Sequence, residues 1–139
     1  MTKEQVIEPL AKFHIRITSG RRFTLPRETR DLYSIKEGYY VELIIRKIDP
    51  KHRKIVGRGL FAPKVSTNGV ITIPKALVEE LEIQKGEVVE ILLINYIAPT
   101  DIFKKLSMDH AYNLLKGGFS LLDSATEKEY IKKHSAKVE

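Results

Sequence analysis

Residues 69–75 read Gly-Val-Ile-Thr-Ile-Pro-Lys, and residues 21–27 read Arg-Arg-Phe-Thr-Leu-Pro-Arg. In both stretches an apolar-Thr-apolar segment ends at a proline, which is typical of a short strand that stops where the ladder N–H is lost. The fixed φ of proline suits the first turn of a helix, so we expect short helices at residues 27–32 and 75–81. The chain therefore contains two similar strand-and-helix units.

The similarity extends well beyond these seven residues. A shift of 48 residues aligns residues 16–47 with residues 64–95 without a gap. The identical pairs are Thr24/Thr72, Pro26/Pro74, Ile35/Ile83, Gly38/Gly86, Val41/Val89 and Glu42/Glu90. Self-similarity at a fixed shift indicates an internal duplication.

Each copy ends in a long apolar strand. Gly38 or Gly86 ends the helical unit, and the expected strands cover residues 39–48 and 88–97. After the first strand, a polar turn at residues 49–54 leads into a returning strand at residues 55–61. Neither copy can cover its apolar face alone, so we expect one shared core.

Composition excludes several classes of protein. The 139 residues include no cysteine, so disulfides and zinc-thiolate sites are absent, and no two of the four histidines stand four residues apart. We therefore expect no metal and no cofactor. No apolar stretch approaches the ~20 residues of a membrane helix, and the N-terminus lacks a secretory apolar core, which predicts a cytoplasmic protein. Asp109 and His110 are adjacent, without a nucleophile elbow or phosphate-binding loop, so we do not expect an enzyme.

The pattern Gly69-x-x-Thr72-x-Pro74 followed by Leu81-x-Ile83-x-x-Gly86 resembles the AbrB/SpoVT family of swapped-hairpin DNA-binding domains. The resemblance covers about residues 13–97. It implies a mainly β fold with short helices, in which two tandem modules interleave their hairpins and close a small β-barrel as a pseudo-dimer within one chain. The first copy departs from the pattern, because Arg21 stands where the second has Gly69, and this leaves the geometry of that turn open.

This organisation predicts four segments, and homodimerisation of the whole chain is left open. The segments are repeat 1 at residues 13–48, a basic hairpin and connection at 49–62, repeat 2 at 63–97 and a C-terminal helical extension at 98–139.

The positive charge is concentrated in the first half of the chain. Of the net charge of +6, residues 13–48 contribute +4 and residues 49–62 contribute +3, whereas residues 63–97 carry −2. The resemblance implies that DNA is contacted by arginines of the hairpin turn and the short helix, positions held here by Arg22 and Arg30. The second copy has Val70 and Val78 at these two positions. The full set of candidate DNA-binding residues is Arg16, Arg21, Arg22, Arg27, Arg30, Lys51, Arg53, Lys54, Lys64 and Lys75.

We therefore predict a cytoplasmic, nucleoid-associated protein or transcription regulator that binds double-stranded DNA through an arginine-rich, lopsided face of repeat 1. The charged residues Glu79, Glu80 and Glu82 are interpreted as a solvated helix face.

The C-terminal extension leaves two alternatives open. Thr100-Asp101 is a plausible helix start, Gly117-Gly118 a stop, and Ser124-x-x-Glu127 has the spacing of a capping box before a second helix. These helices either pack on the barrel as additional core or form an arm that binds a protein partner, as in antitoxins of this superfamily. The alternative function is thus a protein-interaction module, antitoxin-like or scaffolding, that acts through residues 98–139.

Overall fold

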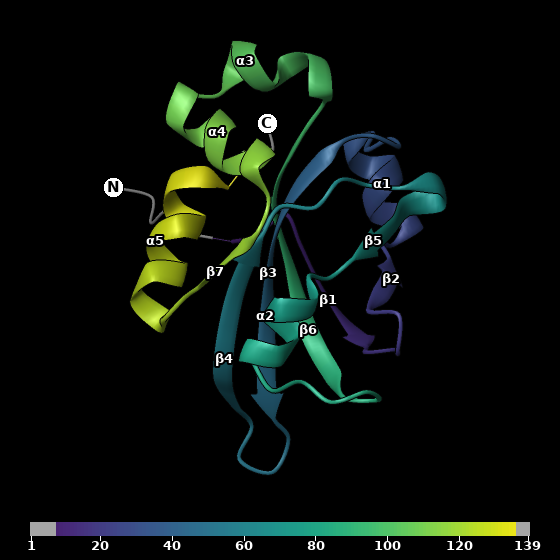
Figure 1. Cartoon of the computed structure of the whole chain (residues 1–139), viewed down its shortest axis with the longest axis vertical. Coiled ribbons are helices and arrows are strands. Elements are labelled where there is room, and N and C mark those ends of the chain that lie inside the picture. The colour runs from purple at the N-terminus through teal and green to yellow at the C-terminus, as the bar shows by residue number, and fades with distance from the viewer. Residues whose placement is uncertain (1–7, 136–139) are drawn as a thin grey trace, which may run out of the picture.

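The computed structural model describes residues 8–135 (Figure 1). Its strands are β1 (Ala11–Arg16), β2 (Arg22–Thr24), β3 (Tyr40–Asp49), β4 (Lys54–Phe61), β5 (Val70–Thr72), β6 (Val88–Ile97) and β7 (Phe119–Leu121). Its α-helices are α1 (Arg27–Tyr33), α2 (Lys75–Glu80), α3 (Ile102–Lys105), α4 (Met108–Lys116) and α5 (Ser124–His134), with short 3-10 turns at Thr67–Gly69 and Pro99–Asp101. None of the described helices is long and apolar enough to cross a membrane.

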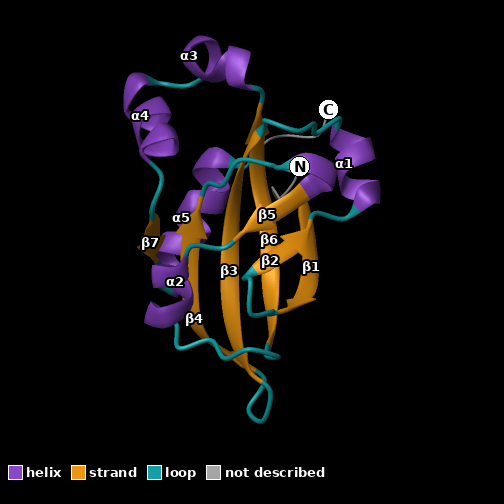
Figure 2. Cartoon of the chain, turned by 45° about the vertical axis from the view of Figure 1, so that its right-hand side comes forward, coloured by secondary structure: helices purple, strands orange, loops and turns teal. Residues whose placement is uncertain are grey.

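The strands form one antiparallel five-stranded sheet, in the order β1-β6-β3-β4-β7, and a separate antiparallel ribbon of β2 and β5. The ribbon lies over one face of the sheet, whereas α5 lies on the other (Figures 1 and 2). Because the sheet ends in β1 on one side and β7 on the other, the described residues form no closed barrel, contrary to the sequence expectation. Strand β7 comes from the C-terminal extension and pairs with part of the edge of β4. In a closed barrel, another strand would have to pair with this edge.

Segments of the first aligned stretch pair with segments of the second. Strand β1 pairs with β6, where Arg16 lies opposite Val88, and an isolated bridge places Tyr40 opposite Lys64. These two pairs correspond under the 48-residue shift, since Arg16 aligns with Lys64 and Tyr40 with Val88. In the ribbon, Phe23 lies opposite its own aligned residue, Ile71.

The main core lies between the sheet and the ribbon. Alternate residues of β3 and β6 point to this side, and their partners come from β2, β5, α2 and the segments that join them. The fully buried members include Val41, Leu43, Ile45, Val89, Ile91 and Leu93 of the sheet and Leu25, Ile71, Ile73 and Leu77 above it. The two long strands are apolar on both faces because both faces are covered.

The second face of the sheet is covered by the C-terminal extension. Ile44, Leu92 and Ile94 point away from the ribbon and form a smaller buried cluster with Ile131 of α5. A third cluster joins Ile97 at the end of β6 to residues of α3 and α4. The structure therefore places much of the extension in the role of additional core.

Local details of the extension differ from the sequence expectation. The predicted first helix is divided into α3 and α4 at Leu106–Ser107, and the Ser107 hydroxyl caps α4 by accepting a hydrogen bond from the His110 N–H at 3.1 Å. The capping box of α5 is formed by Asp123 and Thr126 instead of Ser124 and Glu127. Glu127 is buried against the sheet, where two arginines bind it, and so it cannot reach back to the helix start.

Candidate nucleic-acid interface

The outer face of the β2–β5 ribbon carries the first candidate residue. Phe23 and Ile71 point into the core, so the alternation of a strand turns Arg22 and Thr24 outward on β2 and Thr72 outward on β5. Arg22 lies directly opposite Thr72. An exposed guanidinium thus stands beside threonine hydroxyls on a narrow two-stranded ribbon, a combination that can bind phosphate oxygens or base edges.

The turn before β2 has a left-handed residue at the same aligned position as the turn before β5, although that residue is Arg21 and not glycine. Arg21 adopts the left-handed conformation, with φ of 53°, as its aligned residue Gly69 does with φ of 77°. The Arg21 N–H donates to the Thr18 carbonyl at 3.0 Å, and its side-chain Nε donates to the Ile73 carbonyl at 3.2 Å. The side chain therefore braces the ribbon and compensates in part for a conformation that favours glycine.

Arg30 on α1 has a comparable bracing contact. Its Nε donates to the Leu25 carbonyl at 2.9 Å, and the side chain is half-buried. Its guanidinium lies across Gly69, close enough that a Cβ at position 69 would come within 2.7 Å of the Arg30 Cζ. Arg21, Arg22 and Arg30 are thus gathered around one ribbon, and two of them are oriented by backbone carbonyls.

The other candidate residues are more scattered. Arg16 donates from Nη1 to the Gly86 carbonyl at 2.7 Å, and the Lys64 ammonium lies 5.5 Å from the centre of the Tyr40 ring. Arg27 and Lys75 each face an acid one helical turn away, Asp31 and Glu79, at 3.9 and 4.0 Å.

Lys51, Arg53 and Lys54 form the exposed tip of the long β3–β4 hairpin, which in both views extends beyond the end of the ribbon (Figures 1 and 2). The structure does not bring this tip together with the ribbon arginines.

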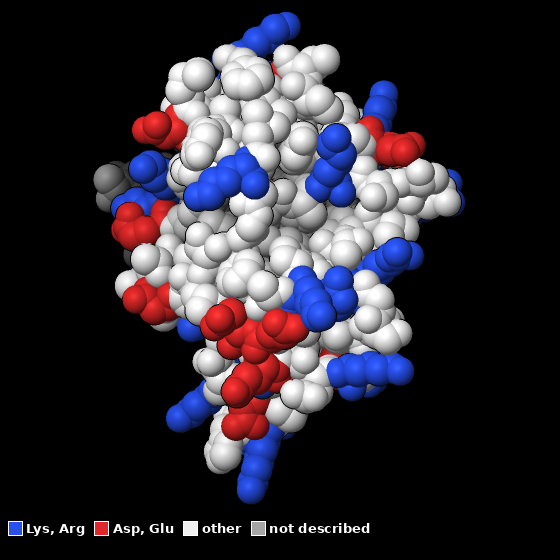
Figure 3. Space-filling view, in the orientation of Figure 1, with Lys and Arg blue, Asp and Glu red and all other residues white. Residues whose placement is uncertain are grey.

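Acidic residues gather on the second half of the chain. The side chains of Glu79, Glu80 and Glu82 are all exposed on or just after α2. Figure 3 shows acidic side chains clustered over this part of the molecule, with basic side chains distributed around them. The charge is therefore lopsided: arginines accompany α1 and β2, and carboxylates accompany α2.

Buried charges beneath the C-terminal helices were missed by the sequence reasoning. Arg46 on β3 donates from Nη1 to Glu90 at 2.7 Å and from Nη2 to Glu127, which also forms an ion pair with Arg58 at 2.6 Å. Burial alone lowers the pKa of Arg46, but the hydrogen bonds that it donates to Glu127 and Glu90 outweigh burial and raise the pKa overall. This cluster fixes α5 on the sheet.

A second buried cluster is centred on Glu42. Its carboxylate is 2.8 Å from Nε2 of His110 and accepts a hydrogen bond from the Tyr130 hydroxyl, and burial raises its pKa. Glu42 and Glu90 are an identical pair of the 48-residue shift, and each lies within a long apolar strand. An acid at the same position of both strands was a sequence signal that each acid has a buried binding partner. Within residues 8–135, no three His, Cys, Asp or Glu side chains are grouped in a way that could hold a metal ion.

Comparison with known proteins gives the chain a class. Residues 64–95 match the family described as antidote-toxin recognition MazE, bacterial antitoxin. The chain thus contains a MazE/AbrB-like domain, which belongs to the same swapped-hairpin superfamily as the proteins that the sequence resembles. No curated protein matches it.

A solved structure is similar to this chain over nearly the whole of its own length. The solution structure of PHS018 from Pyrococcus horikoshii is 37% identical, covers 66% of this chain and 97% of its own, and superposes with a TM-score of 0.58. The chain belongs to the same family as PHS018.

Proposed function

We propose that this protein is a DNA-binding regulator that contacts duplex DNA through the outer face of the β2–β5 ribbon and the adjoining α1. Arg22 makes the central contact. The protein acts by binding DNA, without catalysis. The observation that carries the proposal is the exposed position of Arg22 opposite Thr72, flanked by two arginines whose side chains are held by the Ile73 and Leu25 carbonyls. Such preorientation lowers the entropy lost when an arginine binds phosphate.

We infer further that residues 13–48 and 63–97 are two copies of one module that pair within a single chain. The pairing of Arg16 with Val88 and of Tyr40 with Lys64 supports this, because the shift of 48 residues converts one pair into the other. The hydrogen bonds from the Leu25 N–H to the Gly69 carbonyl and from the Ile73 N–H to the Arg21 carbonyl, at 2.9 and 2.8 Å, are related in the same way.

The two copies are expected to contribute unequally to DNA binding. The second copy offers Val70 and Val78 where the first has Arg22 and Arg30, and Glu79, Glu80 and Glu82 repel phosphates near α2. A single chain therefore reads one half of a site, and a palindromic site would require two chains.

The test is a fluorescence-anisotropy titration with a mixed-sequence duplex at several salt concentrations. Replacing Arg22 by alanine should weaken binding about tenfold and reduce the salt dependence by about one released counterion. Lys132→Ala, an exposed cation on α5, is the matched control and should bind as the wild type does. Absence of duplex binding by the wild type at low salt would end the proposal, and equal losses from both substitutions would show that the contact face is elsewhere.

A second candidate function is supported by an apolar surface on the C-terminal extension. Met108, Tyr112 and Leu115 stand at helical spacing on α4 and are 72%, 68% and 44% exposed, and Phe103 on α3 is 67% exposed. Surfaces of this kind mark protein-binding sites, which fits an antitoxin-like or scaffolding module.

This apolar surface is tested by immobilising the wild-type protein and the variants Tyr112→Glu and Lys132→Glu and comparing which proteins each one retains. A protein that the wild type and the lysine variant retain, but that Tyr112→Glu does not, binds at the apolar surface. Retention by all three would place the contact elsewhere.

A further inference from the structure

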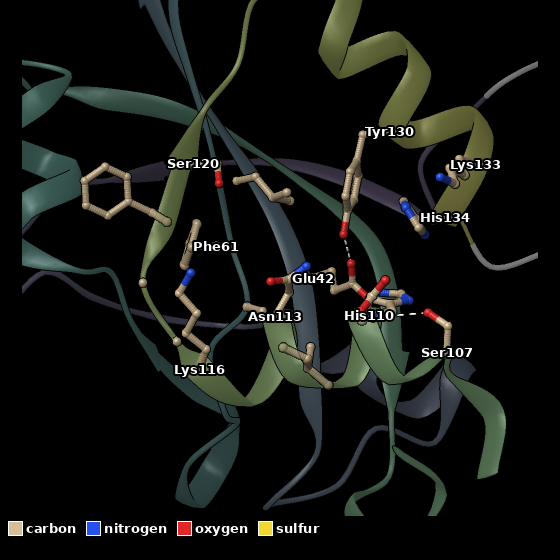
Figure 4. A pocket seen from close by; sticks show the side chains of 17 residues that line it. Glu42, Phe61, Ser107, His110, Asn113, Lys116, Ser120, Tyr130, Lys133 and His134 are labelled. Carbon is tan, nitrogen blue, oxygen red and sulfur yellow. Dashed lines mark hydrogen bonds and ion pairs between the residues drawn. The ribbon is translucent and has the colours of Figure 1, made fainter. Parts of the chain in front are cut away.

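A cavity of about 540 Å³ lies between α4, α5, β7 and the sheet (Figure 4). It is on the opposite side of the sheet from the ribbon, so neither the proposed DNA contact nor the ribbon arginines account for it (Figures 1 and 2). Its volume is in the range of small-molecule sites, about 300–1,000 Å³. The walls divide into an apolar part and a polar part with distinct chemistry.

The apolar part consists of side chains from the sheet edge and α4. Leu60 of β4 and Leu114 of α4 line the cavity, together with Ala62 just after β4. These side chains belong to the two smaller clusters on this face of the sheet, whereas Phe61 and Phe119, which also border the cavity, pack in the main core on the ribbon side. Leu114 is nearly fully buried, which fixes this part of the wall. An apolar group of a ligand would lose water here and contact preformed aliphatic surface.

Glu42 forms the floor and is already satisfied by protein groups. One carboxylate oxygen contacts His110 Nε2 at 2.8 Å and the Asn95 side-chain amide at 3.4 Å, and the other accepts the Tyr130 hydroxyl. The carboxylate therefore orients His110 and Tyr130 in the wall.

The C-terminal end of α5 supplies two basic side chains to the cavity, Lys133 and His134. The His134 ring packs at a tilt against the rings of both His110 and Tyr130, with centroids 4.7 and 4.5 Å apart, and Lys133 lines the wall beside it (Figure 4). The pKa of His134 is lowered, first by burial and then by the positive charges of His110 and Lys133. The acids of the lining are Glu42, which is occupied, and Asp109, which is exposed.

We propose that this cavity binds a small organic anion whose apolar body packs on Leu60, Ala62 and Leu114 and whose carboxylate or phosphate group is held by Lys133 and His134. Among the described residues that line the cavity, the only acids are Glu42 and Asp109, so the anion supplies a counter-charge to Lys133 and His134. The apolar wall selects an anion with an apolar body over a bare inorganic one. This site does not rest on the proposed DNA contact and would exist whether or not the ribbon binds DNA.

The experiment follows the imidazole NMR signals of His134 while benzoate is added to the full-length protein. Benzylamine has the same ring with a positive charge, and inorganic phosphate is an anion without an apolar body. Benzoate should produce saturable shifts of the His134 signals at about millimolar concentration and raise the pKa of His134, since a bound anion stabilises the imidazolium. Benzylamine should leave them unchanged, and phosphate should bind about tenfold more weakly than benzoate.

Two lysines on α5 give a matched pair of variants. Lys133→Gln should weaken benzoate binding about tenfold by removing one charged hydrogen bond, whereas Lys132→Gln, an exposed neighbour outside the cavity, should change it less than about twofold. Both variants should unfold thermally as the wild type does, because both side chains are exposed.

Three results overturn the inference. The first is the lack of a saturable His134 shift with benzoate up to about 10 mM, a concentration well above the expected dissociation constant. The second is equal binding of benzylamine or phosphate, which would remove the role of charge or of the apolar wall. The third is an equal loss of affinity in both lysine variants, which would mean nonspecific attraction to a basic helix.

Discussion

Gly69 leaves the space that the side chain of Arg30 occupies: a Cβ built at position 69 would lie 2.6 Å from both Cδ and Nε of Arg30. The glycine belongs to the turn before β5 and the arginine to α1, so this contact joins the two halves of the candidate DNA-binding face. It also explains why the second turn keeps glycine although Arg21 occupies the aligned position in the first.

Replacing Gly69 by alanine should lower the free energy of unfolding by about 3 kcal/mol. A φ of 77° strains any side chain, and the clash with Arg30 adds to that strain. Gly86→Ala is the control, because its φ is 89° but a Cβ there meets nothing within 4 Å, and it should cost only about 1 kcal/mol. Urea denaturation measures both values. Similar losses for the two variants would show that Arg30 yields without cost.

Replacing Glu127 by glutamine should destabilise the protein by about 2–4 kcal/mol. The change leaves Arg58 without its anion and Arg46 with Glu90 alone, although the side chains of both arginines are only 18% exposed. Glu129→Gln, at an exposed position of the same helix, should stay within about 0.5 kcal/mol of the wild type. Chemical denaturation followed by circular dichroism would reveal the difference, and an equal stability of both variants would argue against the buried cluster.

Acidification should weaken the fold through His134. Its folded pKa lies below the ordinary value of 6.5, so the unfolded chain takes up the proton first and His134 contributes stability above 6.5 that is lost as pH falls through the lower folded value. Glu42 acts in the opposite sense, because its raised folded pKa gives stability that is lost as pH rises from its ordinary 4.5 through the folded value.

The contribution of His134 is isolated by comparing the wild type with His134→Gln across this pH range. Thermal denaturation at each pH should show that the glutamine variant loses less stability than the wild type between pH 7 and the region just below 6.5. Parallel curves would mean that His134 titrates with the same pKa in both states.

Introducing arginine at Val70 should strengthen duplex binding. Val70 lies opposite Thr24 on the ribbon and aligns with Arg22 under the 48-residue shift, so Val70→Arg places on β5 the charge that Arg22 places on β2. Affinity should rise about tenfold at low salt, and the salt dependence should increase by about one counterion. Lys132→Arg, which leaves the net charge unchanged, is the reference in the same anisotropy titration. An unchanged affinity for Val70→Arg would place the DNA outside the outer face of the ribbon.

Much of the local structure followed from sequence patterns. Pro26 and Pro74 end β2 and β5 and precede α1 and α2, and the apolar runs after Gly38 and Gly86 are the long strands β3 and β6. These features depend on the φ of proline, the freedom of glycine and the apolar content of a strand, all of which act within a few residues. The self-similarity at a shift of 48 residues and the positions of the arginines were equally accessible, because both are properties of the residue order.

The tertiary structure decided the features that depend on distant partners. A mainly β chain with two self-similar segments is compatible with a closed barrel or an open sheet, and the observed sheet, in which β7 pairs with the β4 edge, is open. One partner of Glu42, His110, is 68 residues away, and one partner of Arg46, Glu127, is 81 residues away, so no local pattern joins them. The sequence alone thus determined the two self-similar segments and their charge. Only packing of the C-terminal extension on the sheet created the ion pairs of Glu127 with Arg46 and Arg58 and the cavity beside them.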